Sequence, residues 1–337
     1  MYKSTAILLA KSAVLMSLWQ FAAQASVSYC KKEREMIAMD LLDYTSCRLC
    51  PRNCGCDRRI TTGFCGCRAG LRAARAALHH WEEPCISGTR GSGTVFFSGC
   101  TLQCCFCQNF PISAEHYGKD LSPRRLGEIF LDLQDQGAHN INLVTPTQYL
   151  PWILPALDQV RDRLAIPVVY NCGGYEKPET IELLKDYIDI WLPDLKYFDS
   201  GISARYSRAA DYFSVASKAI VQMVNQTGKP VQNASGLLEK GVIIRHMVLP
   251  GQRKDSFRLL RWLKETLEPG TYLLSLLSQF TPFYKSCDYP ELNRRITTFE
   301  YQSVVDEAIR LGLTEGFMQE KSSAKEEYTP PFDLEGI

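Results

Sequence analysis

The sequence predicts an α/β protein whose main domain is an open, partial (β/α)6 TIM-like barrel, preceded by a Cys-rich metal-binding segment. From residue 95 onward, short β-branched and aromatic runs alternate with stretches whose apolar residues recur at helical spacing. Repeated strand–helix units form parallel sheets with right-handed crossovers. The chain has 337 residues. Such barrels often occupy about 200–250 residues, which leaves room for an added segment.

The expected elements follow one another in six strand–helix units. Residues 95–97 are the first strand, because Ser98-Gly99 ends a β-branched and aromatic run. Ser122 and Pro123 begin the next helix, which runs to Gln136, since Ser favours the N-cap and Pro the first helical position. The later strands are expected at residues 141–144, 166–170, 189–192, 242–249 and 271–277, and the later helices at residues 148–164, 178–187, 202–225 with a loop near 211, 257–267 and 299–311.

Composition divides the chain into four parts. These are an N-terminal extension (1–44), a Cys-rich metal-binding segment (45–90), the barrel (91–320) and a polar, Pro-containing tail that we expect to be mobile (321–337). Residues 6–25 are largely apolar and end in Ala-Gln-Ala, which imitates a signal peptide. No other apolar run reaches the ~18 residues of a membrane-spanning helix, so no stable membrane partner is expected.

The charge balance and the cysteines limit the kind of protein this is. Lys and Arg number 38 against 37 Asp and Glu, which gives no argument for a DNA partner. Twelve of the 14 cysteines precede residue 110, and their short spacings fit metal ligation in a reducing compartment better than disulfides. We therefore expect a cytoplasmic protein that keeps its N-terminal extension, with export as the alternative.

One loop after the first strand carries Cys100, Cys104 and Cys107, with the spacing C-x3-C-x2-C. Three such thiolates can bind three irons of a [4Fe–4S] cluster and leave the fourth iron open to another ligand. Zinc is the alternative, but structural zinc sites usually have four protein ligands, commonly as two short Cys pairs. Disulfides are disfavoured, because the four cysteines between residues 100 and 107 do not easily meet the required Cα separations.

A second cysteine cluster lies earlier in the chain. Cys47, Cys50 and Cys54 have the spacing C-x2-C-x3-C, and Cys65 is our choice for a fourth ligand. The surrounding residues are rich in Gly and turn formers, which indicates a small module held together by metal. Zinc and a second iron–sulfur cluster both fit this spacing, and a group of unligated thiols is the alternative.

The loop at Cys100 resembles that of the radical S-adenosylmethionine (radical SAM) superfamily, in which C-x3-C-x2-C follows a strand and an aromatic residue, here Phe106, precedes the last Cys. More narrowly, Phe-Ser-Gly-Cys at residues 97–100 and Cys-Gln-Asn at 107–109 resemble the uncharacterised relatives of pyruvate formate-lyase-activating enzyme. The resemblance extends over about residues 47–317. It implies a [4Fe–4S] cluster on Cys100, Cys104 and Cys107, with S-adenosylmethionine (SAM) as the second cofactor.

Polar residues at the carboxyl ends of the expected strands are the best candidates for binding SAM, because ligands of parallel α/β folds gather there. By resemblance to the activating enzymes, the methionine part of SAM meets Asp194, Lys196 and Arg245, the ribose faces Asn171 and His246, and the adenine packs near Phe106. Arg245 and His246 are neighbours, so on a regular strand they face opposite sides, and one of them is a candidate for a structural role. A surface ion pair between Asp194 and Lys196, and a simple turn at Asn171, are further structural alternatives.

The sequence departs from the family pattern after the second strand. Many members have a Gly-Gly-Glu motif there that meets the SAM amino group, whereas residues 142–148 read Asn-Leu-Val-Thr-Pro-Thr-Gln. That contact would be replaced by Thr145, by Thr147 or by a backbone carbonyl, or Asp194 would have a larger part in binding the amino group. Of these we assign Thr145 to the cofactor site.

The resemblance implies an enzyme that cleaves SAM reductively to methionine and a 5′-deoxyadenosyl radical, which then abstracts hydrogen from an unknown substrate. That substrate is a partner protein if the chain acts like a glycyl radical enzyme activase, and a small molecule or RNA otherwise. A reductant such as flavodoxin or ferredoxin is then required. The alternative is a non-catalytic iron–sulfur or zinc protein that serves electron transfer or structure.

Overall fold

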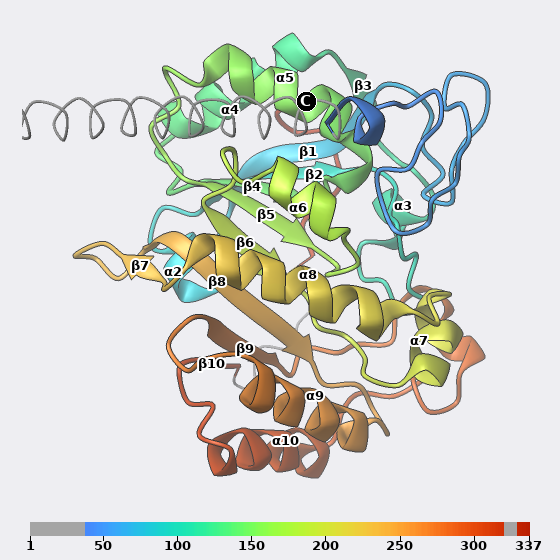
Figure 1. Ribbon diagram of the computed structural model, residues 1–337, viewed down its shortest axis with the longest axis vertical. Coiled ribbons are helices and arrows are strands. Elements are labelled where there is room, and N and C mark those ends of the chain that lie inside the picture. The colour runs from blue at the N-terminus through green and yellow to red at the C-terminus, as the bar shows by residue number, and fades with distance from the viewer. Residues whose placement is uncertain (1–37, 320–328) are drawn as a thin grey trace, which may run out of the picture. The chain divides into compact units, whose positions relative to one another are not determined.

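The computed structural model describes residues 38–319 and 329–337. Within them the strands form an open sheet in the order β10-β9-β8-β6-β5-β4-β2-β1-β3, and β7 (Val231–Gln232) pairs with β8 (Figure 1). The parallel strands are β2 (Ser92–Phe97), β4 (Ile141–Val144), β5 (Val168–Cys172), β6 (Ile190–Pro193), β8 (Leu238–Met247), β9 (Leu273–Leu277) and β10 (Gly316–Met318). The predicted α/β fold with a partial TIM-like barrel is confirmed, and β10 extends the six expected strands by one.

Helices follow the parallel strands and lie along the sheet (Figure 1), with α4 packed on α5, α6 on α8 and α9 on α10. As predicted, the Ser122 side chain caps the first of them by accepting a hydrogen bond from the Arg125 backbone N–H. The predicted loop near Asp211 separates α7 from α8. The bounds are α4 (Pro123–Asp135), η1 (Thr147–Tyr149), α5 (Leu150–Val160), α6 (Pro178–Leu183), α7 (Ser200–Ser207), α8 (Tyr212–Thr227), α9 (Arg253–Thr266), η2 (Tyr284–Asp288) and α10 (Thr298–Arg310), with the short α3 (Phe110–Ser113) after the cysteine loop.

The second half of the expected Cys-rich segment is part of the barrel. β1 (Leu71–His79) pairs antiparallel with β2 and, at its outer edge, with β3 (Lys119–Leu121). The short helix α2 (Pro84–Ser87) then inserts Cys85 and Ile86 among apolar side chains of β5, β6 and β8. Neither element was predicted, because the Ala-, Leu- and Arg-rich sequence of β1 favours a helix when it is considered alone.

The end of the chain is fixed against β1. The Ala76 backbone N–H donates to the Glu335 carbonyl at 2.8 Å, and the Leu334 N–H donates to the Ala74 carbonyl at 3.0 Å. A Cβ at Gly336, where φ is +75°, would lie 2.0 Å from the Ala76 carbonyl oxygen, so only glycine fits there. The mobile tail predicted from residue 321 is therefore wrong for residues 329–337, whose order depends on contacts with β1. Residues 320–328 lie outside the described residues.

An aromatic contact also holds this C-terminal segment. Phe332 packs edge-on against Phe96 with ring centroids 5.7 Å apart, beside Ile112 and Val144.

Phe332→Ala is expected to speed hydrogen exchange of the Ala76 amide. The C-terminal segment accepts the hydrogen bond of that amide, and the substitution removes a packing contact that stabilises the segment by roughly 1–2 kcal/mol. Phe299→Ala on the exposed side of α10 is the matched control, since the Phe299 side chain is 67% exposed. Equal Ala76 exchange in both variants would contradict this account.

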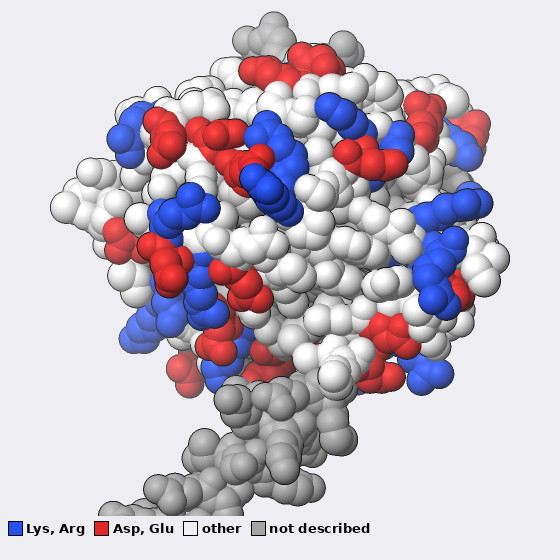
Figure 2. Space-filling model, turned by 90° about the horizontal axis from the view of Figure 1, so that it is seen from above, with Lys and Arg blue, Asp and Glu red and all other residues white. Residues whose placement is uncertain are grey.

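The surface carries both charge signs. On the face in Figure 2, Lys and Arg alternate with Asp and Glu, in keeping with the net charge of +1. In the described part of the chain, no helix is long and apolar enough to cross a membrane. The signal-like residues 6–25 lie outside the described residues.

Candidate active site

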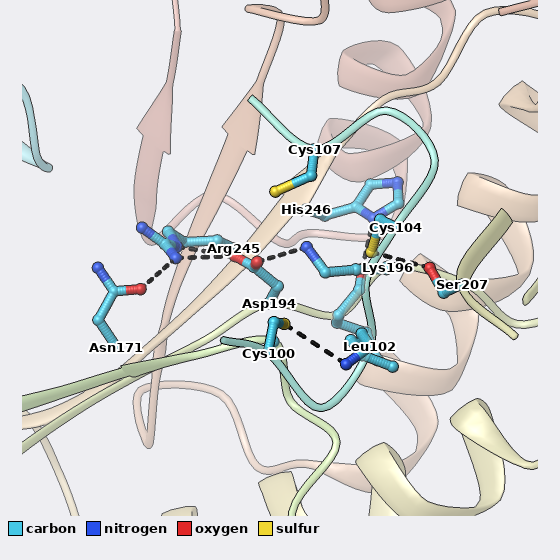
Figure 3. A network of polar contacts seen from close by, with 12 residues as sticks. Cys100, Leu102, Cys104, Cys107, Asn171, Asp194, Lys196, Ser207, Arg245 and His246 are labelled. Carbon is cyan, nitrogen blue, oxygen red and sulfur yellow. Dashed lines mark hydrogen bonds and ion pairs between the residues drawn. The ribbon is translucent and has the colours of Figure 1, made fainter. Parts of the chain in front are cut away.

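The loop with Cys100, Cys104 and Cys107 borders a cavity of about 240 Å³ at the carboxyl ends of the parallel strands (Figure 3). All three cysteines line it. The loop leaves β2 through Gly99, whose φ is +77° and at which a Cβ would lie 2.8 Å from the Cys65 carbonyl oxygen. Glycine is required here, because it lets the loop turn closely against the Cys-rich segment.

Each of the three sulfurs accepts a hydrogen bond. The donors are the Leu102 N–H to Cys100 Sγ at 3.4 Å, the Ser207 hydroxyl to Cys104 Sγ at 2.9 Å and the Ser113 hydroxyl to Cys107 Sγ at 3.1 Å. Burial, with the neighbouring Cys104, raises the pKa of Cys100 to about 11 and that of Cys107 to about 12. These two thiols are therefore neutral at pH 7 unless a cation such as a metal stabilises the thiolate.

A charged network faces the cysteines across the cavity (Figure 3). Asp194 accepts from Lys196 Nζ at 2.6 Å and from Arg245 Nε at 2.9 Å, and Arg245 Nη2 donates to Asn171 Oδ1 at 2.6 Å. Burial acts against the charged form of Asp194, but Arg245 and Lys196 outweigh it and hold the pKa of the carboxyl below its ordinary value. Burial likewise opposes the charge of Lys196, yet Asp194 raises its pKa. Asp194 and Lys196 are thus a mostly buried pair, with 22% and 19% of their side chains exposed, rather than a surface ion pair.

Glu82 belongs to the same network and was missed from the sequence. Its carboxylate accepts from Arg245 Nη1 at 3.2 Å, Asn171 Nδ2 at 3.2 Å and Asn142 Nδ2 at 3.1 Å. Burial raises its pKa, and Arg245 partly offsets that effect. The two adjacent carboxylates of Trp-Glu-Glu-Pro at residues 81–84 were the available signal, but the loop between β1 and α2 brings them into the barrel only through tertiary packing.

Three further predicted residues have different positions. Phe106 lines the cavity and contacts Phe280 with ring centroids 5.8 Å apart. Thr145 also lines it, with a φ of +57° that is unusual for a β-branched residue and typical of strained functional sites. His246 lies on the opposite face of β8, where its ring nitrogens contact the Leu195 carbonyl at 2.7 Å and the Ser256 hydroxyl at 2.9 Å. Of the Arg245–His246 pair, His246 therefore has the structural position.

Cys54 of the second cluster is linked to the first loop through Phe64. Cys54 Sγ accepts from the Phe64 N–H at 3.3 Å, and the Phe64 carbonyl accepts from the Gln103 side chain at 2.9 Å. Burial raises the pKa of Cys50. No group of three or more His, Cys, Asp or Glu residues in the described ranges is arranged to hold a single metal ion, Cys47, Cys50, Cys54 and Cys65 included.

Glu176 is a buried carboxyl in the loop between β5 and α6. It is 2% exposed, and its Oε1 accepts from the Thr147 hydroxyl at 2.7 Å. Among the described residues, its Oε2 has no hydrogen-bond partner. Burial raises the pKa of Glu176 to about 8, so this side chain is mainly neutral at pH 7.

This pKa gives a stability prediction. The ordinary pKa of 4.5 applies to the unfolded chain, so the stability supplied by neutral Glu176 is complete below pH 4.5 and is lost as the pH rises through about 8. In the wild type, the unfolding free energy is expected to fall by up to about 4 kcal/mol between about pH 5 and pH 9 because of Glu176. Glu176→Gln is expected to abolish this fall, because the amide does not ionise. Urea unfolding at the two pH values measures it, and Glu179→Gln in the first turn of α6 is the control. An unchanged pH dependence in Glu176→Gln would show that this carboxyl ionises freely.

A family model of the radical SAM superfamily matches residues 94–263, which is half of the chain. The chain therefore belongs to the radical SAM superfamily, whose members are enzymes that use an iron–sulfur cluster and SAM. The match covers most of β2, the cysteine loop, Asn171 in β5, Asp194 directly after β6, and Arg245 in β8.

Individual relatives are more distant. An uncharacterized protein of Methanocaldococcus jannaschii is 28% identical over 280 residues, which cover 80% of this chain and 76% of that protein. Among solved structures, methylornithine synthase has a TM-score of 0.48 at 14% identity, covering 77% of this chain and 66% of the other. SuiB of Streptococcus suis, bound to precursor peptide SuiA, has a TM-score of 0.41 at 17% identity over 66% of this chain, and the match spans 46% of SuiB.

Proposed function

We propose that this radical SAM enzyme holds a [4Fe–4S] cluster on Cys100, Cys104 and Cys107 and cleaves SAM reductively to make a 5′-deoxyadenosyl radical. One observation carries the proposal: the three thiols and the network of Asp194 and Arg245 line a single cavity. The donor set fits, because three thiols from one loop leave one iron of such a cluster for an outside ligand. When bound, the cluster supplies one electron to SAM.

The network suits the methionine part of SAM. Asp194 stays ionised and is available to the ammonium group, while Lys196, with three N–H donors, is available to the carboxylate. Arg245 fixes Asp194 by a second ion pair at 2.9 Å, so the carboxylate is oriented before the ligand arrives. We assign Thr145 to the amino group and Asn171 to the ribose, because both line the cavity. His246 orients the chain after β6 through the Leu195 carbonyl.

An apolar wall protects this chemistry. Phe106 is 5% exposed and makes edge contacts with Tyr197 and Phe280 at centroid distances of 6.5 and 5.8 Å. Such packing excludes water and competing hydrogen donors from a reactive radical. It also gives the adenine an aromatic surface.

The substrate we propose is a partner protein, as for the glycyl radical enzyme activases. The support is the similarity of residues 97–100 and 107–109 to relatives of pyruvate formate-lyase-activating enzyme.

We also propose a second metal site, zinc or iron–sulfur, on Cys47, Cys50, Cys54 and Cys65. These residues take up their ligand geometry only when the metal binds. The support is their spacing and the link between Cys54 and the first loop through Phe64 and Gln103.

Anaerobic reconstitution tests the enzyme proposal. Purified protein with iron, sulfide and a chemical reductant is expected to convert SAM to 5′-deoxyadenosine and methionine, and iron, sulfide and zinc are quantified in the same sample. A fully metallated, reducible protein that never cleaves SAM, even with candidate partners, would instead favour a non-catalytic iron–sulfur protein. Unchanged metal content in a Cys47/Cys50/Cys54 triple alanine variant would refute the second site.

A further inference from the structure

The cysteine loop reaches the protein surface at a small basic pocket. The Cys105 backbone N–H donates to the Tyr206 carbonyl at 2.8 Å, and the Cys105 carbonyl accepts from the Lys285 N–H at 2.9 Å. Tyr206 and Lys285 both line an outer pocket of about 50 Å³. The backbone between two proposed cluster ligands is therefore one hydrogen bond away from residues at the surface.

Cations surround this outer pocket. Arg205, Arg208 and Lys285 line it and are exposed. Arg205 pairs with Glu291 at 2.9 Å, whereas neither Arg208 nor Lys285 has an ion-pair partner among the described residues. Positive charge is thus in excess here, although the protein as a whole is nearly neutral.

Aromatic rings alternate with these cations. Arg205 lies over the rings of Tyr206 and Tyr289 at 5.7 and 5.2 Å, and Lys285 Nζ lies 5.1 Å from the Tyr284 ring centroid. Tyr206 and Tyr289 contact each other edge-on at 5.4 Å. Here Tyr284 and Tyr289 are half-buried and the arginines are exposed. Tyrosine and arginine are enriched at protein interfaces, and small charged interfaces are typical of transient electron-transfer complexes.

We propose that this surface, defined by Arg205, Arg208, Lys285 and Tyr289, docks a small acidic one-electron carrier protein that reduces the cluster. The proposal rests on the proposed function of the Cys100 loop. In the step, the carrier loses one electron and the cluster gains it, with no bond or proton transferred. Opposite charge steers the two proteins together, so the association weakens as salt concentration rises.

The test uses a bacterial flavodoxin as the acidic carrier and the Arg208→Glu/Lys285→Glu variant of the reconstituted protein. The dissociation constant of this variant for flavodoxin is expected to be at least ~10-fold higher than that of the wild type at low salt. Reduction of the cluster by flavodoxin, measured by absorbance in the absence of SAM, is expected to slow by a similar factor. Lys218→Glu/Lys229→Glu, which makes the same charge change on and beyond α8, is expected to match the wild type.

Two outcomes separate this proposal from the proposed function. Equal flavodoxin affinity and equal reduction rates in both double variants would overturn the docking surface, even if SAM is cleaved. A weakened affinity confined to Arg208→Glu/Lys285→Glu would support the surface, even if the wild-type protein fails to cleave SAM. Reduction by dithionite, which needs no docking, is expected to be equal in all three proteins.

Discussion

Alanine at any one of Cys100, Cys104 and Cys107 is expected to lower reductive SAM cleavage by ~10³-fold or more, because three ligands that act as a unit fail together. Each cysteine lines the same cavity and accepts a hydrogen bond at its sulfur. Iron and sulfide content is expected to fall in parallel with the rate. 5′-Deoxyadenosine formation under anaerobic conditions, with iron analysis of the same sample, measures both.

Cys105→Ala is the matched control for these variants. Cys105 lies in the same loop and is as buried as Cys104, at 8% and 7% exposure, but it does not line the main cavity. We expect the Cys105 variant to keep its iron and at least about half of the wild-type rate. Full turnover in all three ligand variants would refute the assignment, whereas loss of iron in Cys105→Ala would show that the loop responds to any cysteine removed from it.

The cysteine loop was predictable because its chemistry depends on short spacing alone. Cys100, Cys104 and Cys107 are close in sequence, so any compact loop brings them together. The strand ends with Asn171 and Asp194 were predictable for a related reason, since parallel strands place their carboxyl ends at one edge of the sheet. Periodicity therefore gave the order of the strands and helices from β2 to α10, and the parallel topology gave the edge of the sheet at which the cavity lies.

Glu82 and the C-terminal segment were not predictable in this way. Glu82 reaches Arg245 from 163 positions away in sequence, through a strand whose own residues favour a helix. Phe332, near the C-terminus, contacts Phe96 in β2, the first of the parallel strands. Both contacts depend on how long-range packing closes the sheet, and no local propensity or spacing encodes that.

The Arg245–Glu82 ion pair gives the second large effect. Arg245 is 14% exposed, and its guanidinium binds Asp194, Glu82 and Asn171 together. Arg245→Gln leaves Glu82 buried without its cation and Asp194 with Lys196 alone, so we expect a loss of roughly 3–5 kcal/mol in unfolding free energy. SAM binding is expected to weaken at least ~10-fold, because Asp194 loses the partner that orients it.

A double-mutant cycle distinguishes this network from independent contacts. Glu82→Gln in the Arg245→Gln background is expected to recover part of the stability, since it removes the carboxylate that Arg245→Gln leaves without a cation. Arg258→Gln is the control, because its ion pair with Asp199 is exposed on both sides, at 48% and 42%, and is expected to matter by less than about 1 kcal/mol. If the Glu82 and Arg245 effects simply add, the two residues act separately. Glu82 would then belong to the barrel's structure rather than to the pocket that orients SAM.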